Sequence, residues 1–320
     1  MTALLYIQLA GGLTWLLLGG DLLVRGSVAL ARRFHVSPMI VALTVVAFGT
    51  SLPELVVVLR AILTGYPGLA LGNVVGSNIA NVLLVAGLAA VVHPLAIGKG
   101  TSRRDSVGML VVSIVFVAFC ATGYLSRLEG MILLGMLAII AAITAREAAI
   151  AYRQATLTTP LEWVLGLPSS VWTILILIAV GAVGLPVGAN LVVDAAVKMA
   201  AELGVSDAIV GLTILAFSTS LPELATTVVA AARGRTEVAI GAVIGSNLFN
   251  IAAIMGTAAV VSPLPIQVTP DFLRLDLPVM IGTAVLLAAF VWLRRPIGRA
   301  AGVVMVVGYA AYILAVVFGP

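Results

Sequence analysis

Two glutamates draw attention because each lies in an apolar stretch and each ends the same five-residue motif, Thr-Ser-Leu-Pro-Glu. The first copy ends at Glu54 and the second at Glu223. On a helix, residues three and four positions before a glutamate share its face. Each copy therefore presents a carboxylate and two hydroxyls within about one turn. The hydroxyl-bearing residues are Thr50, Ser51, Thr219 and Ser220.

The proline of each motif predicts a broken helix. Proline has no N–H, and its ring clashes with the carbonyl four residues back. Pro53 should therefore release the carbonyl of Gly49, and Pro222 that of Ser218. Inside a membrane, such a break is tolerated where neighbours, water or a bound ion satisfy the freed groups.

The glutamates predict a cation site. An ionised carboxylate at bilayer depth costs ~2.5 kcal/mol or more and marks a functional candidate. Two of them facing each other at about 5 Å would repel by about 3 kcal/mol, so a cation must lie between them or one must be protonated. The surrounding donors are all oxygens, which suit Ca²⁺ or, in smaller number, Na⁺, rather than zinc or copper. The alternative is a purely structural pair of buried acids.

A second motif, Gly-Ser-Asn, follows each glutamate. Ser77 and Asn81 are four residues apart, as are Ser246 and Asn250, so each pair adds a hydroxyl and an amide to one helix face. The alternative role of these segments is close helix packing, which glycine and serine permit. Their repetition beside the glutamates favours a role in binding.

The chain repeats itself. Residues 41–55 and 210–224 are identical at eleven of fifteen positions, and both motifs recur at one offset of 169 residues. We expect five spans in each half, and an odd number makes the second half cross the membrane in the opposite sense. Such inverted repeats are found in secondary transporters, with the substrate at the midplane. We expect a first repeat at 1–150, a linker at 151–169 and a second repeat at 170–320, forming one membrane domain.

The composition predicts an integral membrane protein. The chain is 62% hydrophobic and 9% charged, whereas soluble domains carry about 25% charged residues. Apolar stretches near the ~20 residues that span a bilayer recur along it. The expected fold is all-α, with ten transmembrane helices. They lie at 3–30, 37–61, 71–92, 106–123, 128–148, 170–197, 207–231, 239–261, 276–293 and 300–318.

The basic residues predict orientation rather than nucleic-acid binding, because they lie in short connections and not on a soluble face. Twelve fall in or beside the odd-numbered connections and four beside the even-numbered ones. Basic connections stay cytoplasmic, so both termini are expected outside a cell (inner) membrane. Asp21 and Arg25, four residues apart, are expected to form a structural ion pair.

With its two copies of Thr-Ser-Leu-Pro-Glu, each followed by Gly-Ser-Asn in one register, the chain resembles the sodium/calcium exchanger family of cation/calcium antiporters in its compact prokaryotic form. The resemblance covers essentially the whole chain in span count and spacing. It implies Na⁺ and Ca²⁺ as transported ions and the lipid bilayer as surroundings. No cofactor, enzyme activity or protein partner is implied.

The resemblance also implies a ligand set. Glu54 and Glu223 would bind Ca²⁺ directly, with backbone oxygens of Thr50 and Thr219. Flanking Na⁺ sites would be lined by Ser51, Ser77, Ser220 and Ser246, with the carbonyls of Ala47 and Ala216. Asn81 and Asn250 would border the centre, and spans one and six would slide across the core to expose it to each side in turn.

The chain departs from the family pattern at two positions. Some relatives, including potassium-dependent ones, carry an aspartate where this chain has Asn250, and an amide cannot supply a third charge. Ser218 stands where the first half has Gly49. The amide at Asn250 argues against K⁺ co-transport. Ser218 means that the two repeats are not strictly symmetric.

Three other functions compete with sodium/calcium exchange. A proton/calcium antiporter, or one for another divalent cation, would use the same glutamates, protonated in turn. Its relatives usually carry asparagine and alanine before the glutamate, so Thr-Ser-Leu-Pro-Glu favours sodium. An intramembrane protease would need Gly-x-Gly-Asp or Gly-x-Ser-Gly, and the sequence contains neither. A passive channel would not need two carboxylates in opposed broken helices.

Overall fold

The computed structural model describes residues 2–97, 103–155, 170–202 and 219–318. Within them, seven helices are long and apolar enough to cross a membrane, and one bent pair makes an eighth. The fold is thus that of an all-helical membrane protein. The expected span at 106–123 corresponds to α7, which begins with three charged residues and is not among these helices. Residues 207–218, which belong to the span expected at 207–231, lie outside the described part. The number ten therefore stays a prediction.

The first half begins with one long helix, breaks repeatedly in its second span and ends with another long helix. Its elements are α1 (Thr2–Arg33), α2 (Pro38–Val41), η1 (Ala42–Val46), α3 (Ala47–Thr50), α4 (Leu52–Leu63), α5 (Pro67–Ala80), η2 (Asn81–Ala86), α6 (Gly87–Val92), α7 (Arg103–Cys120), β1 (Tyr124–Leu125) and α8 (Arg127–Ala155). The η segments are π-helical turns.

The second half follows the same plan where it is described. Its elements are α9 (Val171–Glu202), α12 (Leu221–Ala232), α13 (Thr236–Leu248), η4 (Phe249–Met255), α14 (Gly256–Val261), β2 (Ile266–Gln267), η5 (Phe272–Asp276), α15 (Leu277–Trp292) and α16 (Arg299–Phe318). The two-residue strands β1 and β2 pair antiparallel and are a small departure from the all-α expectation.

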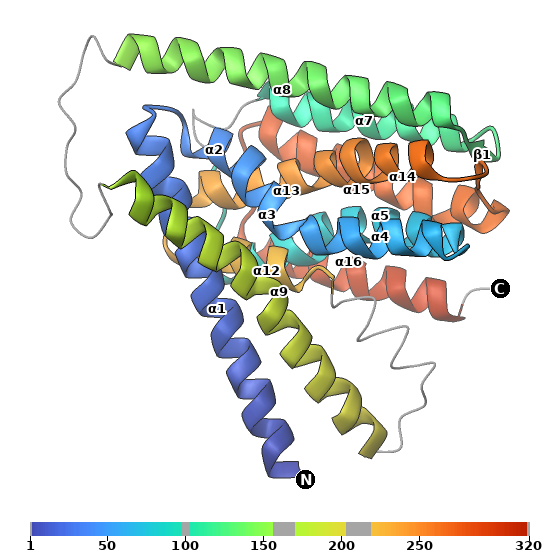
Figure 1. The fold of residues 1–320 in the computed structure, drawn as a ribbon, viewed down its shortest axis with the longest axis horizontal. Coiled ribbons are helices and arrows are strands. Elements are labelled where there is room, and N and C mark those ends of the chain that lie inside the picture. Colours follow the sequence, from blue (N-terminus) through green and yellow to red (C-terminus); the bar gives the residue numbers. More distant parts are fainter. Residues whose placement is uncertain (1, 98–102, 156–169, 203–218, 319–320) are drawn as a thin grey trace.

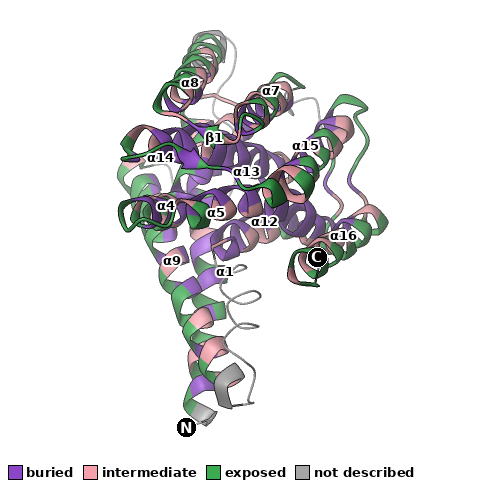
Figure 2. Cartoon of the chain, turned by 90° about the vertical axis from the view of Figure 1, so that its right-hand side faces the viewer, coloured by how far each residue is buried: buried purple, intermediate pink, exposed green. Residues whose placement is uncertain are grey.

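The two halves interleave in one body. Helix α13 packs on α2 and η1, α12 packs on η2 and α6, and α8 packs on η4 and α14. In the apolar stretches of the spans Pro67–Val92 and Thr236–Val261, 83% and 94% of the residues are buried, compared with 11% in Arg299–Phe318. Figure 2 shows the buried helices α5, α12 and α13 surrounded by α8, α15 and α16, whose outer faces are exposed. The centre of the bundle is therefore where polar groups are most fully removed from solvent.

Helices α1 and α9 form a pair that runs obliquely to the rest of the bundle and projects beyond it (Figure 1). Glycines recur every seven residues along their contact: Gly12, Gly19 and Gly26 on α1, and Gly181 and Gly188 on α9. A Cβ atom at Gly181 would lie 2.8 Å from the backbone of Gly19. Such small residues let membrane helices approach backbone to backbone, so α1 and α9 pack as one unit.

Candidate cation site

Both glutamate motifs adopt the same local backbone. Ser51 has φ −89° and ψ 5°, and Ser220 has φ −88° and ψ 1°. The predicted break is confirmed in the first half, where Pro38–Thr50 and Leu52–Leu63 meet at 46°. Proline takes the second position of α4 and of α12, where no intrahelical N–H is needed. Each glutamate consequently lies in the first turn of a helix, where the helix dipole favours negative charge.

The two glutamates meet at the buried centre. Glu54 is 1% exposed and Glu223 is 4% exposed, and their carboxyl groups interact directly. The Ser51 hydroxyl of the first half donates a hydrogen bond to Glu223 Oε1 of the second half at 3.1 Å. The Oε2 atoms of both glutamates are buried and have no hydrogen-bond partner within the described chain. Buried carboxylate oxygens without partners are costly, and a cation is the natural partner for two of them.

Some hydroxyl groups of the site already form hydrogen bonds within the protein, and others have no partner among the described residues. The Oγ atoms of Ser220 and Ser246 are buried without a partner in the part of the chain described. The Thr50 hydroxyl donates to the Ala47 carbonyl at 3.3 Å, and the Ser51 N–H donates to the same oxygen at 3.0 Å. A carbonyl has two lone pairs, so Na⁺ could bind the Ala47 oxygen only after the Thr50 hydroxyl turns away.

Two further expected ligands line a common cavity, and one falls outside the described residues. Ser77 is buried, Thr219 is half-buried, and both line one cavity of about 560 Å³. Farther along this cavity, Tyr312 donates a hydrogen bond to Asp276 at 2.6 Å. Ala216 lies outside the described residues.

Asn247 and the backbone carbonyl of Asn78, which were not among the expected ligands, form a hydrogen-bonded chain with the Asn81 amide. Asn81 Nδ2 donates to Asn247 Oδ1 at 3.0 Å, and Asn247 Nδ2 donates to the Asn78 carbonyl at 3.3 Å. Neither side-chain polar atom of the buried Asn250 has a partner among residues with described positions. Asn78 and Asn247 are the asparagines of the repeated Gly-Ser-Asn motif and lie 169 residues apart. This repetition was the sequence signal that could have identified them as candidate residues of the site.

The chain matches a known protein family along most of its length. The sequence model of the sodium/calcium exchanger protein family matches residues 4–145 and 173–318. The chain belongs to the sodium/calcium exchanger family.

Individual relatives cover the full length of this family member. It is 35% identical over 315 residues to the inner membrane protein YrbG of Escherichia coli, covering 98% of this chain and 95% of that one. It is 29% identical to the sodium/calcium exchanger MaX1 of Methanosarcina acetivorans, covering 97% of each chain. A solved structure of the sodium-calcium exchanger NCX_Mj, soaked with Na⁺ and Ca²⁺, superimposes with a TM-score of 0.82 and 31% identity over 100% of both chains.

Two π-helical turns accompany the amides of this exchanger-family chain. Segment η2 begins at Asn81, and η4 contains Asn250 as its second residue. A π turn shifts the register of the residues that follow it, and such turns are frequent at functional sites. The two turns occur at corresponding places in both halves, so we interpret them as a shared feature of the region around Asn81 and Asn250.

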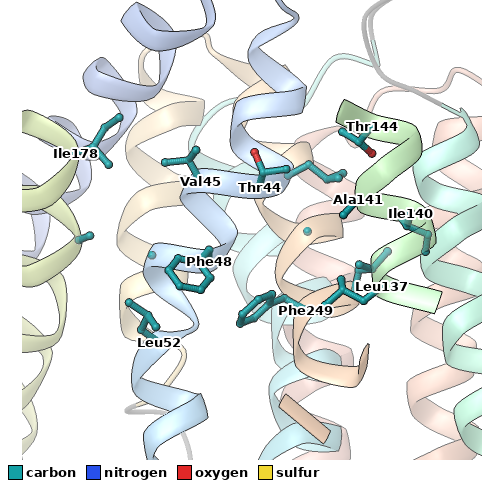
Figure 3. Close-up of a pocket in the computed structure, with 15 residues that line it drawn as sticks. Thr44, Val45, Phe48, Leu52, Leu137, Ile140, Ala141, Thr144, Ile178 and Phe249 are labelled. Atoms are coloured by element: carbon teal, nitrogen blue, oxygen red, sulfur yellow. The ribbon is translucent and has the colours of Figure 1, made fainter. Parts of the chain in front are cut away.

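The polar side chains gathered at this buried centre are carboxylates, hydroxyls and amides. Among the described residues, no group of three or more His, Cys, Asp and Glu side chains could hold a metal ion. The carboxylate pair is supplemented instead by hydroxyls and amides, which favour hard cations such as Ca²⁺ and Na⁺. A neighbouring cavity of about 570 Å³ is a poor ion path, because its lining is carbon-rich apart from Thr44 and Thr144 (Figure 3).

The expected ion pair on α1 is confirmed and has a third member. Arg25 Nε lies 2.8 Å from Asp21 Oδ2. Arg233, which follows α12, also pairs with Asp21. Because α12 carries Glu223, this contact connects the oblique α1–α9 pair to the helix that bears one of the two carboxylates.

Proposed function

We propose that this protein is a secondary active antiporter that exchanges Na⁺ for Ca²⁺ through one site built on Glu54 and Glu223. The observation that carries the proposal is the meeting of these two buried carboxylates, each with one oxygen lacking a partner in the described structure. The relatives MaX1 and NCX_Mj, both named sodium/calcium exchangers, support the same pair of ions.

We assign the ions as follows. Ca²⁺ is bound by Glu54 and Glu223 with backbone oxygens of Thr50 and Thr219. Na⁺ is bound at flanking positions lined by Ser51, Ser77, Ser220, Ser246 and the carbonyls of Ala47 and Ala216, with Asn81 and Asn250 bordering the centre.

Exchange follows from charge. The empty site is disfavoured because two ionised carboxylates repel each other in a medium of low dielectric constant. Either one Ca²⁺ or several Na⁺ can neutralise them, but both sets cannot share the same oxygens. The site therefore changes sides only when it is loaded, which makes transport an obligatory exchange. If more than two Na⁺ move per Ca²⁺, the exchange is electrogenic.

We further propose the architecture that alternates access. Ten spans form two inverted five-helix repeats, at 1–150 and 170–320, joined by the linker at 151–169, with both termini outside. Helices α1 and α9 slide together across the core. The close glycine contact between them supports movement as one unit, since separating them would expose backbone to lipid.

Radioactive Ca²⁺ uptake into proteoliposomes tests the proposed coupling. We expect uptake into vesicles loaded with Na⁺ to exceed uptake into choline-loaded vesicles by about tenfold or more, because only Na⁺ can replace Ca²⁺ at the carboxylates. Control vesicles without Na⁺ but with an imposed pH gradient should show only the choline level. Uptake that follows the pH gradient and ignores Na⁺ would instead establish a proton/calcium antiporter using the same glutamates. Uptake without any counter-ion would identify a channel.

A further inference from the structure

We propose that Asn247 is a positioning residue that turns the amide of Asn81 so that its oxygen, and not its NH₂ group, faces the cation site. The proposal rests on the function proposed above. All three residues concerned, Asn78, Asn81 and Asn247, are at most 3% exposed, so water does not compete freely for their hydrogen bonds.

The orientation of Asn247 is fixed by a backbone group. The carbonyl of Asn78 can only accept a hydrogen bond. Asn247 must therefore direct its Nδ2 atom to that carbonyl, at 3.3 Å, and its Oδ1 atom away from it. The flipped amide would place two oxygens against each other and leave both without a donor, a costly arrangement in a buried site.

The orientation of Asn247 then fixes that of Asn81. Asn247 Oδ1 can only accept, and it accepts from Asn81 Nδ2 at 3.0 Å. Because the amide of Asn81 is planar, its Oδ1 atom points away from Asn247, and this atom is buried without a partner within the described ranges. An amide oxygen is a ligand for Ca²⁺ or Na⁺, whereas an NH₂ group repels a cation.

Among the described residues, the second half has no counterpart of this arrangement. The residue that corresponds to Asn247 is Asn78, and its Nδ2 atom bonds to the Val74 carbonyl of its own helix at 2.7 Å. Neither polar atom of the Asn250 side chain has a partner in the described structure. Of the two central amides, that of Asn81 is therefore held in a cation-binding orientation by described residues, and that of Asn250 is not.

A double-mutant cycle on Ca²⁺ affinity, measured by calorimetry on the detergent-solubilised full chain, tests this role. The variants are Asn81→Ala, Asn247→Ala and the double variant. We expect each single variant to weaken Ca²⁺ binding by about tenfold, the scale of one hydrogen bond or ligand to a charged group. If Asn247 acts through Asn81, the double variant is also weakened by about tenfold and not by about a hundredfold.

Asn78→Ala is the matched control, because it removes the equivalent side chain and keeps the backbone carbonyl. In the Asn78→Ala background, Asn81→Ala should still weaken Ca²⁺ binding by its full factor of about ten. Independent, multiplying effects of Asn81→Ala and Asn247→Ala would overturn the positioning role, as would unchanged affinity in Asn247→Ala. If the alanine variant does not fold, Asn247→Leu keeps the side-chain volume and removes both polar atoms. Absence of Ca²⁺ binding by the wild-type protein would instead overturn the proposed function itself.

Discussion

Replacing Glu54 by Gln is expected to reduce Na⁺-dependent Ca²⁺ uptake by about a hundredfold or more, because removing one member of a buried charge group costs roughly 3–5 kcal/mol. Glutamine keeps the shape of the side chain but supplies no charge to neutralise the cation. Uptake into Na⁺-loaded proteoliposomes measures the loss. Glu223→Gln should have the same effect, since Glu223 faces Glu54 across the centre.

Melting temperatures distinguish a loss of ion binding in Glu54→Gln from a loss of folding. In buffer without Na⁺ or Ca²⁺, Glu54→Gln should melt at the same temperature as the wild type or higher, because it relieves carboxylate repulsion. Added Ca²⁺ should raise the melting temperature of the wild type but not that of Glu54→Gln. Glu147→Gln is a suitable control, because Glu147 forms an exposed pair with Arg104 and such pairs contribute little. Near-normal uptake by Glu54→Gln would show that this carboxylate does not bind the transported ion.

Gly245→Ala is expected to lower the free energy of unfolding by about 3 kcal/mol and to abolish exchange. A Cβ atom at Gly245 would lie 2.5 Å from the carbonyl oxygen of Leu43 and 2.8 Å from the Cβ of Ala47. These neighbours are backbone or a short side chain, so helix α13 must move away from η1 and α3. Ser246, which follows Gly245, would be displaced from the centre as a result.

Thermal unfolding in detergent, together with vesicle uptake, measures this effect. Gly282→Ala on α15 is the control, because a Cβ atom there meets nothing within 4 Å. This control should be neutral or stabilised by up to about 1 kcal/mol, the difference in helix propensity. Equal melting temperatures for Gly245→Ala and the control would contradict the close packing of α13 on the second span.

The local features of the site could be predicted because each depends on neighbours in the sequence. Pro53 fixed the place of the break, and the repeat made Ser220 a copy of Ser51. The pairing of Asp21 with Arg25 followed from a spacing of four residues on a helix. The pairing of Asp21 with Arg233 did not follow, because it depends on how α12 packs against α1.

Other features left no local signal in the sequence. The π turns η2 and η4 lie in stretches so apolar that hydrophobic periodicity cannot separate one helical pitch from another. The pairing of β1 with β2 joins segments from opposite halves. The bond between Asn81 and Asn247 likewise depends on the approach of η2 and α13. The repeat showed which residues correspond, but not which of the corresponding bonds would form.

Anomalous diffraction from crystals grown with Ca²⁺ tests the central claim most directly, because it places the ion without reference to transport. The account predicts a peak bound by carboxylate oxygens of both Glu54 and Glu223, and the loss of that peak in Glu54→Gln. A Ca²⁺ peak bound elsewhere, with the two carboxylates in contact and no ion between them, would contradict a shared cation site.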